Sequence, residues 1–328
     1  MSAILGDDEL GYRPGHVNRT WNGRPYVLVN PDWPEPVVQM DGFTDKPGEP
    51  RGKSAIYTRV TTFISCLEDT YALGEWQNRM VALGMAVRPQ LVAQAQRVDL
   101  DAPQDQVKEQ LNEVAYAAKD AANWKLKADL GTDFHEITRE YDGGRRDWRN
   151  LSDTSRSMLA AYATATKGCT FEFIEARLVN DTLKYLGTTD RLGWVECSEC
   201  VPGKSVTRLN ALRVYDLKTG RIDFGQSKMA LQLAAYSLSK LYDPDTGIRT
   251  DLPICPHVAY IIHAPYGEGT CAIYPVPLAP ALEALTELVP RVRAFRAKMN
   301  WFDAPLLSGG QATSGVAAAW SVEPPESL

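Results

Sequence analysis

An aspartate and a lysine near the middle of the chain have the types and spacing that phosphate chemistry needs. Asp216 and Lys218 flank Leu217 at the end of an apolar run that predicts a strand. Residues i and i+2 of a strand point to one face, so both side chains should project together. A carboxylate can ligate a hard divalent cation, and an ammonium can activate a water and balance negative charge. Phosphodiester hydrolysis requires these functions.

Further ligands for such a cation lie elsewhere in the chain. Asp190 stands on a preceding predicted strand, and if the two strands pair, both acids can meet one ion. His135, inside a predicted helix, offers an imidazole, and Leu217 offers its backbone carbonyl. Oxygen ligands with one nitrogen favour Mg²⁺ or Mn²⁺.

Each of these pieces is weak when taken alone. A D-x-K triplet is expected by chance roughly once in a chain of this length. Gly131 and His135 also fit a packing glycine and a hydrogen-bonded core histidine. Gln232 and Tyr236 share one face of a predicted helix, which is often only half exposed. The order of the pieces carries the argument: helix with histidine, strand with aspartate, strand with D-x-K, and helix with Q-x-x-x-Y.

This ordered set resembles the RecB-like branch of the PD-(D/E)XK nucleases, especially exonucleases encoded by bacterial viruses. The resemblance covers about residues 131–242, with a weaker likeness at 57–76. It implies a restriction-endonuclease-like core in which Asp190, Asp216 and Lys218 are catalytic and His135 is a metal ligand. The same resemblance implies that Gln232 and Tyr236 are also catalytic, and that Glu175 is an auxiliary acid. The residue before Asp190 is threonine instead of the family's proline, which this branch tolerates.

Basic residues near these motifs are candidates for DNA contact. Lys204 and Arg208 lie in the polar insertion 198–210 between the two acidic strands, and Arg145 and Arg146 follow the histidine helix. Such charges more often form a solvated face, and their position beside the predicted core favours contact with the DNA backbone. The formal net charge of -6 argues against a protein that coats DNA but not against local binding.

The six cysteines are spread over the chain, so we expect reduced core residues and no disulfide framework. Cys197 and Cys200 form one C-x-x-C pair, which supplies two of the four ligands that a structural zinc needs. Some RecB-like nucleases carry a four-cysteine iron–sulfur cluster, but the number and spacing here do not fit, so no such cluster is expected.

The elements that must position these residues suggest an α/β fold with a mixed central sheet flanked by helices. We expect helices over 70–85, 104–140, 152–166, 224–242 and 279–299, and strands over 26–29, 171–179, 186–197, 212–217, 258–263 and 271–276. The expected organisation is an irregular extension (1–56), a nuclease domain (57–302, with a helical part at 57–166 and a catalytic core at 131–300) and a flexible tail (303–328).

The expected activity is a metal-dependent DNA exonuclease that acts in phage recombination, replication or end processing. Two alternatives stay open: a structure-selective endonuclease on the same fold, and a non-catalytic DNA-binding or assembly module. The expected partners are linear or single-stranded DNA ends, and recombination or replication proteins. No membrane-spanning segment or signal peptide is evident, so a cytoplasmic location is expected, in the host cytoplasm if the protein is viral.

Overall fold

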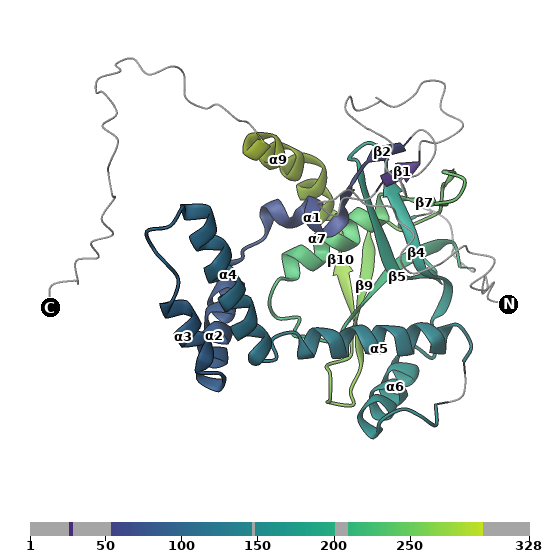
Figure 1. Cartoon of the computed structure of the whole chain (residues 1–328). Helices are drawn as coiled ribbons and strands as arrows, with labels where there is room; N and C mark the ends of the chain where they lie inside the picture. The colour runs from purple at the N-terminus through teal and green to yellow at the C-terminus, as the bar shows by residue number, and fades with distance from the viewer. Residues whose placement is uncertain (1–25, 29–53, 146–147, 201–208, 298–328) are drawn as a thin grey trace, which may run out of the picture.

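A mixed sheet forms the centre of the molecule in the computed structural model, which describes residues 26–28, 54–145, 148–200 and 209–297 (Figure 1). Eight strands build it, in the order β10-β9-β6-β5-β4-β7-β8, with β3 beside β5. Their bounds are β3 Thr58–Arg59, β4 Thr170–Asn180, β5 Tyr185–Val195, β6 Ala211–Lys218, β7 Lys240–Tyr242, β8 Arg249–Thr250, β9 Val258–His263 and β10 Ala272–Pro277. The pairs β6–β9 and β3–β5 are parallel and the others antiparallel. The expected mixed α/β fold is thus confirmed. A small two-stranded sheet joins β1 (Tyr26–Leu28) and β2 (Ser54–Ile56).

Helices cover both faces of the sheet. One core cluster packs α1 (Val60–Ile64), α7 (Gln226–Ser237) and α8 (Ala279–Glu283) against one face. The other packs α5 (Leu126–Asp142) and α6 (Asp153–Ala165) against residues such as Leu217. Alternation along β6 therefore turns Leu217 toward α5 and α6, and Asp216 toward α7. A π-helical segment, Ala284–Leu288, continues α8 into α9 (Val289–Ala297).

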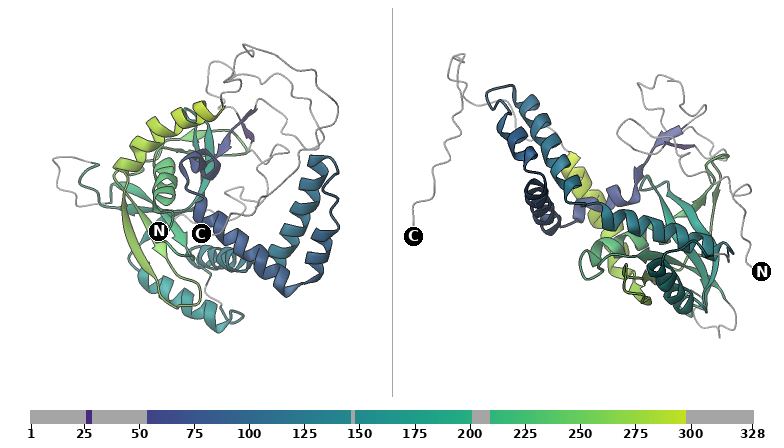
Figure 2. Two further views of the ribbon diagram at one scale, coloured as in Figure 1. Left: turned by 90° about the vertical axis from the view of Figure 1, so that its left-hand side faces the viewer. Right: turned by 60° about the horizontal axis from the view of Figure 1, so that its bottom comes forward.

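The expected N-terminal helices form a group beside the sheet (Figures 1 and 2). It contains α2 (Tyr71–Val87), α3 (Gln90–Gln96) and α4 (Gln104–Ala121). A Cβ on Gly84 would lie 1.7 Å from the carbonyl oxygen of Ala118, so glycine lets α2 and α4 approach closely. Within the described ranges, every helix is too short or too polar to cross a lipid bilayer.

Two expected helices were wrong in extent. The predicted helix over 104–140 is divided into α4 and α5, because Asn123 adopts a left-handed backbone with φ 54° that no helix interior tolerates. The predicted helix over 224–242 ends at Ser237, where the side chain of Asn180 donates to the carbonyl of Leu238 at 2.9 Å. Residues 240–242 instead form β7 beside β4. Residues 303–328 and most of 1–56, expected as tail and extension, lie outside the described residues.

Candidate active site

The candidate site lies where β5 and β6 separate. Their pairing runs from Val195–Ala211 to Arg191–Tyr215 and stops before the next step, which would pair Asp190 with Asp216. Beyond that point β6 continues its pairing with β9 only, through Lys218. The backbone N–H of Leu217 donates instead to Asp190 Oδ2 at 2.6 Å. The two acids therefore face each other at the opening between the two strands.

The surroundings of Asp190 favour the ionised form of its carboxylate. His135 Nδ1 on α5 lies 3.4 Å from its Oδ1, and the Arg191 guanidinium is its neighbour in sequence. Burial acts to raise the pKa of Asp190, but His135, Arg191 and the N–H of Leu217 together lower it below the usual range. Asp190 is therefore an ionised carboxylate at neutral pH.

Asp216 is more deeply enclosed, with 4% of its surface exposed. Lys218 forms an ion pair with its Oδ2, and Gln232 Nε2 donates to its Oδ1 at 3.2 Å. Burial raises the pKa of Asp216 to about 6; Lys218 opposes this shift and the charge of Asp190 adds to it. Burial acts to lower the pKa of Lys218, but the two carboxylates outweigh it and raise that pKa. Lys218 is thus a charged ammonium at neutral pH.

Glycines allow the surrounding helices to approach the two strands. A Cβ on Gly131 of α5 would lie 2.6 Å from Oγ1 of Thr219, the residue that directly follows Lys218. A Cβ on Gly187 of β5 would lie 2.7 Å from the ring of Tyr236. Tyr236, 3% exposed, accepts a hydrogen bond of 3.3 Å from Gln232, and burial raises the pKa of its phenol well above the usual range. The motif glycines thus let α5 and α7 bring their side chains to the acids.

The structure therefore brings together most of the predicted catalytic residues: Asp190, Asp216, Lys218, His135, Gln232 and Tyr236. Glu175 on β4 belongs to the same region. The flanking pairs Ile174–Arg191 and Ala176–Thr189 place it opposite Asp190, where its own backbone has φ 54°. Such a conformation is strained for glutamate and is concentrated at functional sites.

The side chains of His135, Asp190 and Asp216 offer the types of donor atom that a hard divalent cation prefers, but the spacing between these atoms is wide. Asp216 Oδ2 is a buried oxygen paired with the Lys218 ammonium, and a divalent cation would compete with Lys218 for it. However, within the part of the chain that the structure describes, the donor atoms of His135, Asp190 and Asp216 do not all lie within 4.8 Å of one another. A cation held by all three side chains would need these donor atoms closer together than they lie here. The Leu217 carbonyl stays a predicted ligand.

A buried network behind the acids did not stand out in the sequence. Arg191, 1% exposed, donates from Nε to Asp142 at 2.7 Å and from a terminal nitrogen to Thr138 at 2.9 Å. Tyr162 donates to the same Asp142 carboxylate at 2.6 Å. The network fixes β5 against α5 and α6, beside Asp190. Its only sequence signal was an arginine on the core face of a predicted strand.

The predicted DNA-contacting residues are not brought to the site by the described structure. Arg145 lies beyond the end of α5, ten residues from His135, where it pairs with Glu140 and stacks on Trp148. Arg146, Lys204 and Arg208 lie outside the described residues.

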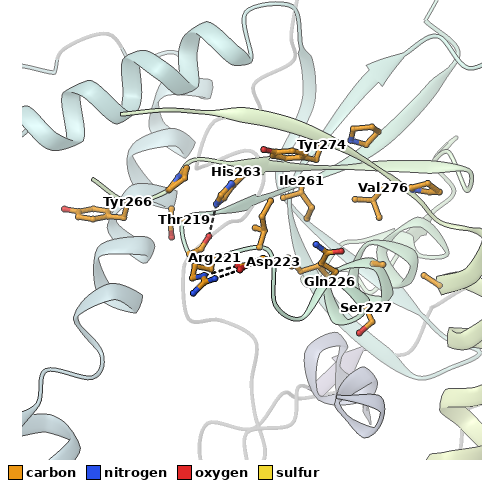
Figure 3. Close-up of a pocket in the computed structure, with 18 of the residues that line it drawn as sticks. Thr219, Arg221, Asp223, Gln226, Ser227, Ile261, His263, Tyr266, Tyr274 and Val276 are labelled. Carbon is orange, nitrogen blue, oxygen red and sulfur yellow. Dashed lines mark hydrogen bonds and ion pairs between the residues drawn. The ribbon is translucent and has the colours of Figure 1, made fainter. Parts of the chain in front are cut away.

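A cavity of about 1100 Å³ adjoins the end of β6, directly after Lys218 (Figure 3). Thr219 and Gly220 form the edge nearest the acids, and α7 and the β9–β10 hairpin supply further walls. Its lining is mainly apolar and aromatic, with Trp76, Ile261, Tyr266, Tyr274 and Val276. Arg221 is paired with Asp223, and His263 Nε2 lies 2.9 Å from the Gly220 carbonyl (Figure 3).

Comparisons with known proteins supply no relative from which a role could be transferred. No family model matches the chain, and no curated protein matches it.

Proposed function

We propose that this chain is a metal-dependent deoxyribonuclease of the RecB-like PD-(D/E)XK type, with a restriction-endonuclease-like core, that hydrolyses phosphodiester bonds at DNA ends. The observation that carries the proposal is the meeting of Asp190, Asp216 and Lys218 where two strands separate. Hydrogen bonding from Gln232 and the imidazole of His135 complete the arrangement. The family likeness extends the proposal to phage recombination, replication or end processing.

The acidic and basic side chains of the candidate site would have different roles. Asp190 and Asp216, with His135, would hold Mg²⁺ or Mn²⁺, and Leu217 would add its carbonyl. When bound, that cation polarises the phosphoryl oxygen and lowers the pKa of a water. Lys218, held as an ammonium by Asp216, orients the attacking water and stabilises negative charge on the phosphate; a raised pKa argues against its acting as the base. Gln232 fixes the Asp216 carboxylate, and Tyr236 fixes Gln232.

The cavity beside β6 supports a nucleic-acid substrate. A phosphate that reaches Lys218 would place its neighbouring nucleotide against Thr219 and Gly220 at the cavity edge. Aromatic side chains such as Tyr274 and Trp76 offer surfaces on which bases can stack without sequence preference. This lining favours an unpaired strand over a rigid duplex, and the choice of an exonuclease rests on the family likeness.

The test is a nuclease assay on end-labelled linear DNA with Mg²⁺ or Mn²⁺. Asp216→Ala and Lys218→Ala should each reduce cleavage at least about 100-fold, while circular dichroism shows an intact fold. Lys240→Ala is the matched control, because Lys240 forms an exposed ion pair with Asp251 on the edge of the sheet. Wild-type rates in either folded active-site variant would overturn the proposal.

The same preparation separates the alternatives. Closed circular DNA stays intact with an exonuclease and is opened by a structure-selective endonuclease. A binding or assembly module would cleave neither substrate, and calorimetry would detect no divalent cation at the acids.

A further inference from the structure

Three cysteines from two distant segments of the sequence converge at the far end of the β5–β6 pair. The sulfurs of Cys197, Cys200 and Cys255 all lie within 4.8 Å of one another, and Cys197 and Cys255 Sγ are 3.6 Å apart. We propose that these three thiolates bind one zinc ion, at a site separate from the acidic residues and independent of the proposed nuclease activity.

The backbone around the thiols is fixed before any metal binds. Asn210 accepts from the Cys197 N–H at 2.8 Å and donates to the Cys197 carbonyl at 2.9 Å. The N–H of Cys255 donates to the Leu212 carbonyl at 2.7 Å, which ties its segment to the start of β6. His257 Nδ1 lies 3.2 Å from the Glu199 carboxylate, so the two cysteine-bearing segments also meet through side chains. A preformed site loses little conformational entropy on binding.

The sulfur spacing is compatible with a thiolate metal site. Zinc–sulfur bonds of about 2.3 Å in a tetrahedron place neighbouring sulfurs about 3.8 Å apart, close to the 3.6 Å between Cys197 and Cys255. A disulfide would need the same two atoms at about 2.05 Å. Cys197 and Cys255 are 3% and 1% exposed, whereas Cys200 is half-buried. The fourth zinc position would therefore be filled by water from the side of Cys200.

The number of cysteines favours zinc over an iron–sulfur cluster, and the local charge suits a thiolate metal site. Three thiolates and one Zn²⁺ carry a net charge of −1, and the Arg213 guanidinium faces Cys197 and Cys255 to balance it. Arg213 Nε is buried without a hydrogen-bond partner. A cubane cluster needs a fourth cysteine. The three others pack elsewhere: Cys66 against the α1–α7 core, and Cys169 and Cys271 against the α5–α6 core.

The position lets the metal link neighbouring strands, although three protein ligands leave the fourth position open, unlike the four-ligand sites of structural zinc. Cys197 is seven residues along the chain from Asp190, about 23 Å in an extended strand. A metal here joins the end of β5 to the segment that leads into β9, on either side of β6. It would hold together the strands that carry Asp190 and Asp216.

The test uses the full chain, purified with reductant and without added metal. Mass spectrometry should find about one zinc ion per chain, and the double variant Cys197→Ser/Cys255→Ser should lose it. Cys169→Ser/Cys271→Ser is the matched control, because both thiols pack in the other core, and it should keep its zinc.

Cobalt substitution keeps the test decisive if the first double variant fails to fold. Removal of zinc from the wild-type chain by a chelator, followed by Co²⁺, should produce thiolate-to-cobalt charge-transfer absorption with tetrahedral ligand-field bands. A wild-type chain with neither zinc nor this spectrum would overturn the proposal. So would a Cys197–Cys255 disulfide in the reductant-treated protein.

Discussion

Asp190 and Asp216 face each other across one strand pair, yet their surroundings act on their charges in opposite directions. Asp190 accepts the N–H of Leu217 and lies beside His135, and its pKa is lowered. Asp216 is enclosed and close to Asp190, and its pKa is raised to about 6 although Lys218 pairs with it. The ionised form of Asp190 therefore stabilises the fold, whereas the ionised form of Asp216 costs stability until a cation compensates it.

This difference predicts unequal effects of two isosteric substitutions in metal-free protein at neutral pH. Asp190→Asn should lower the melting temperature more than Asp216→Asn does, because only the first removes a favourable charge. The sign follows from linkage: stability from a lowered carboxyl pKa is present above the unfolded value and is lost as pH falls through the folded value. The cost from Asp216 arises as pH rises from about 4 toward about 6.

Thermal unfolding in the presence of EDTA, followed from pH 4 to pH 8, measures both effects. The gap between wild type and Asp190→Asn should stay nearly constant over this range, because the stability from the lowered pKa of Asp190 is lost only below about pH 4. A larger loss of stability in Asp216→Asn than in Asp190→Asn at neutral pH would contradict the assigned environments.

At the scale of elements, glycines at motif positions decide how closely the helices approach the sheet. Gly187 lies against the ring of Tyr236, and a Cβ there would also lie 2.8 Å from Val60 on α1. Both neighbours are buried, so neither can move without disturbing the core. The glycine on β5 thus sets the distance between α7 and the strand that carries Asp190.

Gly187→Ala should therefore destabilise the fold by about 1–3 kcal/mol and displace Tyr236 and Gln232 from Asp216, which lowers kcat. Gly74→Ala is the matched control, because a Cβ on this helical glycine meets nothing within 4 Å. It should be neutral or stabilising by up to about 1 kcal/mol. Chemical denaturation and the cleavage rate measure the two effects, and equal stability of both variants would refute the close-packing argument.

The elements that were predictable from the sequence are those with strong periodicity or clear end signals. The alternation over 171–179 and the helix expected over 152–166 both correspond to real elements, β4 and α6, and in the structure the Ser152 side chain caps α6 by accepting from the Ser155 N–H at 3.1 Å. The left-handed backbone at Asn123 is a single-residue feature that the strong helical composition around it masked, and the turn of residues 240–242 into β7 depends on pairing with β4, so local propensity did not reveal either.

The candidate site likewise combines contacts that local patterns predict with contacts that depend on the tertiary fold. Alternation along β6 was enough to predict that Asp216 and Lys218 share a face, and their ion pair confirms it. The buried pairing of Arg191 with Asp142 joins residues 49 positions apart. The approach of Cys255 to Cys197 spans 58 positions. Contacts of that range follow from the sheet order, which the sequence pattern left open.

At the scale of the whole molecule, the mixed sheet places a hard acidic site and a soft thiol site at opposite ends of the β5–β6 pair. Carboxylates with one imidazole favour Mn²⁺ or Mg²⁺, whereas thiolates favour zinc. The two sites should therefore be separable by choice of metal. The N-terminal helices α2–α4 stand beside the sheet and take no part in either donor set.

Mn²⁺ at about 100 times its dissociation constant should stabilise the wild-type fold by about 2.7 kcal/mol. The double variant Asp190→Asn/Asp216→Asn should show no such gain, and Cys197→Ser/Cys255→Ser should retain it if that variant folds. Differential scanning fluorimetry with and without Mn²⁺ measures the shift. An unchanged Mn²⁺ response in the double asparagine variant would place the ion elsewhere.

The most direct test of the nuclease proposal is cleavage of end-labelled linear DNA by the purified wild-type chain, with Mn²⁺ or Mg²⁺ and with EDTA. We predict release of label in the presence of either cation, none with EDTA, and none from Asp216→Ala under any condition. DNA that remains intact with both cations, in a preparation whose fold is confirmed by circular dichroism, would contradict the proposed function.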